Sequence, residues 1–315
     1  LRASGLRWRG ADGQRREAGA RRAVVLAAGA FGSPQLLMLS GIGPAHALLS
    51  HGITPLRDAP GVGANLHDHL QIGLRYRLKD AATLNPLMQP GAIGLARRAR
   101  MALQFALAGR GPLTMAPCQL GLFARSSPEA DRADLGWNVL AFSKPAFDAP
   151  FDPFPGLTMI VYDLRPTSRG RLSLRSADPQ AAPRILMNYL ATERDRRVAV
   201  DGLRFTRRLM AATALADQSP QELWPGPALA SDDEAGLLDA VRQRAGTIYH
   251  PVGTARMGAD GDPLAVLDAS LRVRGVAGLR VVDASAMPSI VSGNTASPTV
   301  MIGEKGASLL LAEQD

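Results

Sequence analysis

A short apolar strand that runs directly into a glycine turn and a helix restricts most strongly how this chain can fold. Residues 23–28 are apolar and β-branched at their centre, which is typical of a buried strand. The stretch "GAFGSPQLLMLSGIGP" follows at once. Within it, Ser33 is suited to cap a helix, Pro34 to occupy its first position, and Gly41 to end it. We expect a strand–turn–helix unit whose backbone N–H groups can face an anion or a cofactor.

The rest of the chain does not alternate strands and helices regularly. Two strands are expected around the turn "ADGQ", and a structured loop over residues 51–70, where glycine and proline are frequent. Strand-like runs such as "LTMIVYDLRP" mix with helical runs at 194–212 and 234–244. This order predicts an α+β region with an antiparallel sheet. Near the C-terminus we expect a hairpin-like pair of strands over 271–283 and a helix over 299–311.

Length and composition exclude several classes of protein. At 315 residues the chain exceeds one typical core, so we expect two domains or one domain with a large insertion. The net charge of +8 comes from scattered arginines without an aromatic-interleaved basic stripe, which argues against a nucleic-acid partner. The single Cys118 excludes an internal disulfide and fits a cytoplasmic location. No apolar run reaches the roughly 18 residues that a membrane-spanning helix needs.

The histidines are the first candidates for chemistry. His67, Asp68 and His69 form the one local cluster, but ligands so close together in an irregular loop need not converge, and we expect no metal site. His250 lies in "IYHPVGTARMG", where Pro251 favours an extended backbone and Gly253 allows a close approach. A lone histidine in such a place is either a core residue bonded to a backbone carbonyl or a catalytic group.

A second stretch favours the catalytic interpretation. In "VVDASAMPSIVSGNTASPTVMIGEK" a buried strand ends at Asp283, and Asn294 comes just before a helix start, where free backbone donors collect. This stretch, with "GAFGSPQLLMLSGIGP", "PGVGANLHDH" and "YHPVGTARMG", resembles the ordered motifs of the glucose–methanol–choline (GMC) flavoprotein oxidoreductases. The residues within these motifs are most similar to those of the choline and alcohol dehydrogenase branch.

The resemblance implies an α+β and α/β fold: a partial FAD-binding domain with an inserted antiparallel-sheet substrate domain. It places the partial FAD-binding domain at 1–75, the substrate domain at 76–245, and the return to the FAD-binding domain at 246–315. It also implies FAD as cofactor and a small-molecule alcohol as substrate, with an electron acceptor that the sequence does not name.

The resemblance assigns roles to the two candidate residues. His250 would be the general base that takes the hydroxyl proton of an alcohol while the hydride leaves to the flavin. A neutral imidazole suits this role because its ordinary pKa lies near 6.5. Asn294 would orient the alcohol oxygen through its amide. The product is an aldehyde or a ketone.

Further residues are implied near the cofactor. Ala28, Gly29, Asp283, Ala284 and Thr295 would contact FAD, largely through backbone groups. Two of them have plain structural alternatives, because Asp283 can cap the following turn and Thr295 can satisfy local backbone. Tyr249 would line the substrate pocket or pack in the core. Asn65 and His69 would fix their own loop, with contacts to the flavin or to the other domain as the alternative.

The sequence departs from the family pattern in two places. In "NTASP", Ala296 stands where relatives often have a second asparagine, so Asn294 would carry the polar role alone. No Gly-x-Gly-x-x-Gly motif follows a first strand, although the family uses one to hold the pyrophosphate. The chain opens on Leu1, so we expect its natural beginning to lie upstream. An alternative is a truncated, silent chain, or half of a split flavoprotein whose partner supplies that segment.

Overall fold

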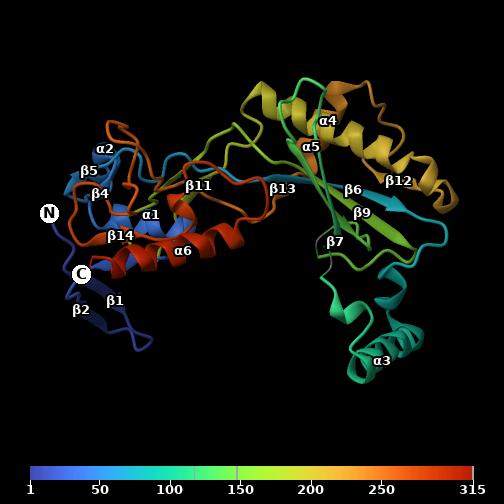
Figure 1. The fold of residues 1–315 in the computed structure, drawn as a ribbon, viewed down its shortest axis with the longest axis horizontal. Coiled ribbons are helices and arrows are strands. Elements are labelled where there is room, and N and C mark those ends of the chain that lie inside the picture. Colours follow the sequence, from blue (N-terminus) through green and yellow to red (C-terminus); the bar gives the residue numbers. More distant parts are fainter. Residues whose placement is uncertain (117, 147, 314–315) are drawn as a thin grey trace. The chain divides into compact units, whose positions relative to one another are not determined.

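The structure is a computed structural model that describes residues 1–116, 118–146 and 148–313 (Figure 1). It contains two compact units. Unit 1 comprises Leu1–His69, Arg165–Ala191 and Tyr249–Asp315, and unit 2 comprises Leu70–Leu164 and Thr192–Ile248. The sequence placed the changes of domain after residues 75 and 245, and it left 165–191 in the middle domain. The functional roles of the two units stay predictions.

Unit 1 contains short strand pairs around helices. Its elements are β1 (Gly5–Arg9), β2 (Arg15–Gly19), β3 (Val24–Leu26), α1 (Gly29–Leu39), β4 (Ile42–Gly43), α2 (Ala45–Leu49), β5 (Arg57–Asp58), β10 (Arg171–Ser173), β11 (Arg184–Leu186), β14 (Leu279–Val281), the 3-10 helix η4 (Ala284–Ala286) and α6 (Ala296–Leu311). β1–β2 and β10–β11 are antiparallel pairs, whereas β3–β14 and β4–β5 are parallel pairs. The hairpin-like pairing expected over 271–283 is limited to one antiparallel bridge, between Arg272 and Arg280.

The strand–turn–helix unit is present, but its helix begins earlier than the sequence indicates. α1 starts at Gly29, directly after β3, and Ser33 and Pro34 lie inside it. Gly29 has a φ of +77°, which turns the chain sharply between strand and helix. The expectation that Ser33 caps the helix is therefore wrong. A long-range contact replaces the cap, because the backbone N–H of Gly29 donates to Asp283 at 3.0 Å.

The core of unit 1 joins segments that are far apart in the sequence. Leu37 of α1 packs in one buried cluster with Val252, Leu267, Val281 and Ala286. Each of these five side chains is at most 1% exposed. The loop that carries His250 is therefore anchored in the same core as α1 and β14.

Unit 2 is built on an antiparallel sheet. Its strands lie in the order β12-β6-β9-β8-β7, and β13 pairs with β6. The strands and helices of the unit are β6 (Leu70–Arg77), η1 (Asn85–Leu87), α3 (Gly91–Ala108), η2 (Pro112–Thr114), β7 (Cys118–Ala124), β8 (Leu135–Leu140), β9 (Gly156–Asp163), α4 (Glu193–Met210), η3 (Thr213–Gln218), β12 (Gln221–Trp224), α5 (Glu234–Arg244) and β13 (Gly246–Thr247). The predicted antiparallel arrangement of this region is confirmed.

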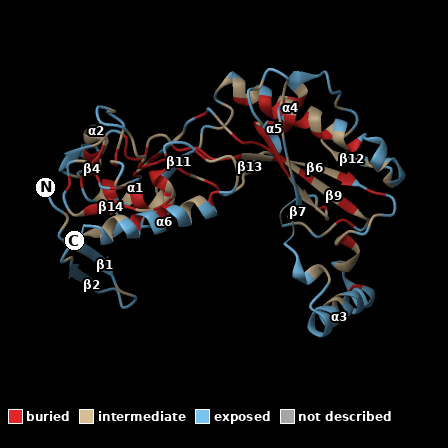
Figure 2. Cartoon of the chain, viewed as in Figure 1, coloured by how far each residue is buried: buried red, intermediate tan, exposed pale blue. Residues whose placement is uncertain are grey.

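α4 packs on this sheet through one buried stripe (Figure 2). The Oγ1 of Thr192 accepts the N–H of Asp195 and so caps the helix. Leu203 and Thr206 are fully buried, and Thr206 accepts a hydrogen bond from the indole of Trp137 on β8 at 2.8 Å. A Cβ on Gly202 would come within 3.0 Å of Val161 on β9, so this glycine permits the close approach of helix and strand.

α3 differs from the other long helices because it is almost wholly exposed. Gly94 is the one buried residue along Gly91–Ala108, and Leu95, Leu103 and Leu107 are each more than half exposed (Figure 2). Within the described part of the chain, no helix has both the length and the apolar character needed to cross a membrane.

Candidate active site

His250 lies where two loops of unit 1 pair with each other. His67 and Val252 form an antiparallel bridge, and the N–H of Gly63 donates to the carbonyl of Thr254 at 2.7 Å. These contacts hold the 62–69 loop against the 250–254 loop. The side chain of His250 is 7% exposed and its backbone N–H donates to Asp68 at 2.9 Å. The predicted catalytic histidine is thus a buried residue on a firmly anchored loop.

The Asp68 carboxylate is a support that the sequence analysis did not identify. One oxygen accepts the backbone N–H of His250, and the other accepts the hydroxyl of Tyr189 at 2.6 Å. Burial lowers the pKa of His250, while the negative charge of Asp68 raises it. The first effect is the larger one, so His250 is held mainly as a neutral imidazole near pH 7.

The three residues His67, Asp68 and His69 point to different partners. The Nδ1 of His67 lies 2.6 Å from the carbonyl of Asn65, and its Nε2 accepts the N–H of Ile290 at 2.9 Å. The Nδ1 of His69 lies 3.1 Å from the Nδ1 of His250. These side chains fix neighbouring segments in place instead of converging on one point.

Asn65 joins its own loop to three other segments of unit 1. Its amide nitrogen lies 3.2 Å from the carbonyls of both Gly253 and Pro288, and its oxygen accepts the Nε–H of Arg169 at 3.0 Å. Gly253 has a φ of +90°, and a Cβ there would lie 2.7 Å from the Asn65 amide. The interpretation that Asn65 fixes its own loop stays a prediction, while these bonds tie that loop to three other segments.

Asp283 holds the start of α1 against the end of β14. One carboxylate oxygen accepts from the backbone N–H of Gly29 and the hydroxyl of Ser33, and the other accepts from the N–H and hydroxyl of Ser285. Asp283 is 4% exposed and is the N-cap of η4. Asp283 therefore caps the turn that follows it, as the structural alternative predicts, and it also links the start of α1 to the segment after β14.

The other predicted residues lie on the surface or at a helix start. Thr295 is buried as the N-cap of α6 and makes no side-chain cap bond, and Asn294 before it is exposed. The Nδ1 of His250 contacts His69, and its backbone N–H donates to Asp68. Neither of these two contacts involves Asn294. Tyr249 is 73% exposed and has a φ of +65°, which is a strained conformation for this residue. Ala28 is exposed beside the Gly29 turn.

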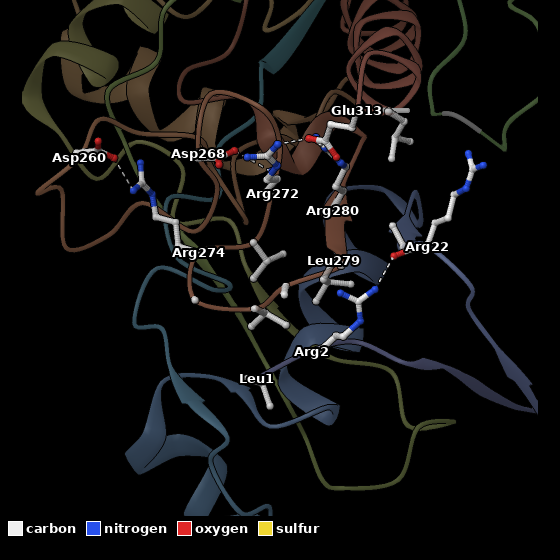
Figure 3. A pocket seen from close by; sticks show the side chains of 17 residues that line it. Leu1, Arg2, Arg22, Asp260, Asp268, Arg272, Arg274, Leu279, Arg280 and Glu313 are labelled. Carbon is white, nitrogen blue, oxygen red and sulfur yellow. Dashed lines mark hydrogen bonds and ion pairs between the residues drawn. The ribbon is translucent and has the colours of Figure 1, made fainter. Parts of the chain in front are cut away.

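A cavity of 1020 Å³ in unit 1 is lined by other residues than these. Five arginines line its wall, together with apolar residues and three acidic ones (Figure 3). Arg274 pairs with Asp260 at 2.8 Å, and Glu313 accepts from both Arg272 and Arg280. None of the residues that line this cavity belongs to the loop that carries His250.

Two family models match the chain, both described as GMC oxidoreductase. The N-terminal model covers residues 1–71 and the C-terminal model covers residues 166–303. This chain belongs to the GMC oxidoreductase family. The resemblance read from its motifs is confirmed.

Similar proteins of this family include dehydrogenases. The chain is 40% identical to "Alcohol dehydrogenase [acceptor]" of Pseudomonas putida, over 93% of this chain and 51% of that protein. It is also 40% identical to "Oxygen-dependent choline dehydrogenase" of Stenotrophomonas maltophilia, over 98% of this chain and 54% of that protein. The chain spans about half the length of the curated relatives that it matches.

A solved structure shows the same fold. A mutant of Aspergillus oryzae formate oxidase, studied for its effect on FAD modification, matches with a TM-score of 0.88 and 28% identity. The match covers 99% of this chain and 58% of that chain. The predicted α+β and α/β fold class of a GMC oxidoreductase is confirmed.

Proposed function

We propose that this chain forms the catalytic part of an FAD-dependent oxidoreductase that converts an alcohol to an aldehyde or ketone. The observation that carries the proposal is the buried His250, whose neutral imidazole is anchored by Asp68 and His69. Family membership and the two dehydrogenase relatives support the same reaction class.

The residues of unit 1 fit an FAD group in two places. At the start of α1, Gly29 has a positive φ, and a Cβ built on it would meet nothing within 4 Å. At the start of α6, a helix of 16 residues, Thr295 leaves the first backbone N–H groups without a side-chain cap. Such a helix start favours oxygen atoms that carry negative charge. We infer that Ala28, Gly29, Asp283, Ala284 and Thr295 hold the cofactor there.

The chain's own residues would then divide the chemistry. When bound, FAD accepts the hydride that leaves the alcohol carbon. The Nδ1 of His250 is occupied by His69, so Nε2 is the atom that takes the hydroxyl proton. Asn294 would donate its amide N–H to the alcohol oxygen and so fix the orientation of the C–H bond. Tyr249, exposed at 73%, would lie beside the entering alcohol.

A second polypeptide segment is needed for cofactor binding under this proposal. Parallel sheets are normally buried with several strands, but β3 pairs only with β14 within the described chain. Val25 in the middle of β3 is 41% exposed. We infer that a further segment or chain pairs with this edge and supplies the glycine-rich phosphate loop. The assay therefore varies both the alcohol and the electron acceptor.

Flavin reduction in the intact protein tests the proposal. A series of alcohols that includes choline is mixed anaerobically with the protein, and the bleaching of the flavin is followed. His250→Gln should lower the rate constant by about 10²- to 10⁴-fold while bound FAD is retained. His51→Gln, which removes an imidazole elsewhere in unit 1, is the control. Full-rate reduction in His250→Gln would remove His250 from the mechanism.

A further inference from the structure

Two imidazole rings, those of His69 and His250, lie against each other at the centre of the candidate active site. The Nδ1 atoms of His69 and His250 are 3.1 Å apart, within hydrogen-bond distance. Their rings meet edge to face, with an interplanar angle of 85°. His69 is 0% exposed and His250 is 7% exposed, so water does not readily replace either partner. In this short contact, one Nδ1 must carry a hydrogen and the other must accept it.

The direction of this hydrogen bond decides what His250 can do. If His69 donates, the neutral His250 carries its proton on Nε2, and that nitrogen cannot accept another. If His250 donates from Nδ1, its Nε2 has a free lone pair and can act as a base. In the second arrangement the bond also survives when Nε2 becomes protonated, because Nδ1 keeps its hydrogen throughout.

We propose that His69 is a positioning residue whose Nδ1 accepts the Nδ1–H of His250 and so keeps the Nε2 of His250 available to take a proton. The inference rests on the proposed function of His250 as base. It assigns to His69 the role that a carboxylate has in a serine–histidine–aspartate triad, but with an uncharged acceptor.

The surroundings of the pair agree with this assignment. His67 cannot take the place of His69, because its Nδ1 bonds to the carbonyl of Asn65 and its Nε2 accepts from Ile290. The Asp68 carboxylate faces the backbone N–H of His250 and the hydroxyl of Tyr189. The charge of Asp68 therefore stabilises an imidazolium on His250 from the side of the main chain, while His69 sets the tautomer. Arg169, which donates to Asn65, acts on the charge of His67.

Nitrogen NMR of the intact protein tests the direction of the bond without any assay of activity. The protein is labelled with ¹⁵N-histidine, and the His250 signals are assigned by their loss in His250→Gln. A protonated Nδ1 and an unprotonated Nε2 on His250 near neutral pH are expected. A His250 that carries its proton on Nε2 would overturn the proposal, whether or not the protein turns over an alcohol.

Variants of His69 test its effect on the reaction. His69→Leu removes the acceptor and should lower the rate constant of flavin reduction by about tenfold or more, with little change in KM. His69→Asn can offer its oxygen near the position of Nδ1 and should recover most of that loss. It also covers the case in which leucine at this buried position prevents folding. His46→Leu, at an exposed position of α2, is the control and should match the wild type.

The outcomes separate the two proposals. Loss of activity in His250→Gln together with an unchanged rate and unchanged tautomer in His69→Leu would overturn the role of His69 alone. An unchanged rate in His250→Gln would overturn the proposed function, and the NMR result would still decide the direction of the bond.

Discussion

The hydroxyl of Thr254 donates a hydrogen bond of 2.5 Å to the backbone carbonyl of Ala30 inside α1. In a regular helix this carbonyl would accept the N–H of the residue four positions later, which is Pro34. Proline has no N–H, so the carbonyl would be left without a partner. Thr254 is fully buried and supplies the missing donor. The loop that carries His250 is thereby fixed to α1 at the point where the helix lacks its own bond.

Replacing Thr254 should therefore be costly only while Pro34 is present. Thr254→Val keeps the shape of the side chain but leaves the Ala30 carbonyl unsatisfied, and it should lower the free energy of unfolding by about 1–3 kcal/mol. In a Pro34→Ala background the helix can supply its own N–H, and the same substitution should cost clearly less. Denaturant unfolding of the four proteins in this double-mutant cycle measures the difference. Equal costs in both backgrounds would contradict the explanation.

Gly253 allows the close contact between the two loops at His250. Its φ of +90° favours glycine, and a Cβ would lie within 2.8 Å of atoms of Asn65 and His67. Gly253→Ala should lower the free energy of unfolding by about 1–2 kcal/mol for the backbone conformation and about 1–3 kcal/mol more for the clash. Denaturant unfolding gives the total, and flavin reduction should fall with it because His250 shares this loop.

Gly261 provides a matched control for this prediction. It has a similar φ of +86°, but a Cβ there meets nothing within 4 Å. Gly261→Ala should show the backbone cost alone and leave flavin reduction unchanged. If both substitutions lower stability equally, the contact with Asn65 and His67 does not matter.

The carboxylate of Asp283 should be difficult to replace even by its amide. Each of its oxygens accepts two donors of the protein, so the NH₂ group of Asp283→Asn would face two of them. We expect a loss of about 2–4 kcal/mol in the free energy of unfolding. Asp58→Asn is the control, since Asp58 is exposed and accepts the N–H of Ala45 at 3.0 Å. A thermal or denaturant series on both variants measures the difference, and equal small losses would show that Asp283 is not a structural link.

Local sequence patterns predicted several of the longer elements of the fold. The helix over 234–244 is present as α5, and the helix expected over 299–311 is present as α6, which begins at Ala296. The start of α1 was misplaced because Ser33 and Pro34 form a good local capping pattern. That pattern was overridden by Asp283, whose distance in the sequence hides it from any local rule.

The candidate site shows the same limit more strongly. The motif around His250 identified that residue, but its partners Asp68 and His69 come from a loop about 180 residues earlier in the chain. One signal was available, because a His-Asp-His run in a buried loop has polar groups that need partners. Only a three-dimensional structure says which partners these are.

His67 should make the protein less stable in mild acid. Its Nδ1 bonds to the carbonyl of Asn65 and its Nε2 accepts the N–H of Ile290, so a second ring proton would face the donor on Ile290. Burial, followed by the positive charge of Arg169, lowers the pKa of His67 from 6.5 to about 4. The imidazole therefore stays neutral in the folded protein over a range of pH in which the unfolded chain binds a proton.

The sign of the effect follows from this difference in proton binding. Above pH 6.5 the His67 ring is neutral in both the folded and the unfolded protein, and its contribution to stability is complete. Between pH 6.5 and about 4 the unfolded chain binds a proton that the folded protein does not, so the free energy of unfolding falls. The full effect is about 3 kcal/mol. Urea unfolding from pH 7 to pH 4 should show a shallower decline in His67→Gln than in the wild type, although this variant starts from a lower stability. His46→Gln, which removes an exposed imidazole, controls for the loss of a histidine. A decline as steep in His67→Gln as in the wild type would mean that another group accounts for the acid sensitivity.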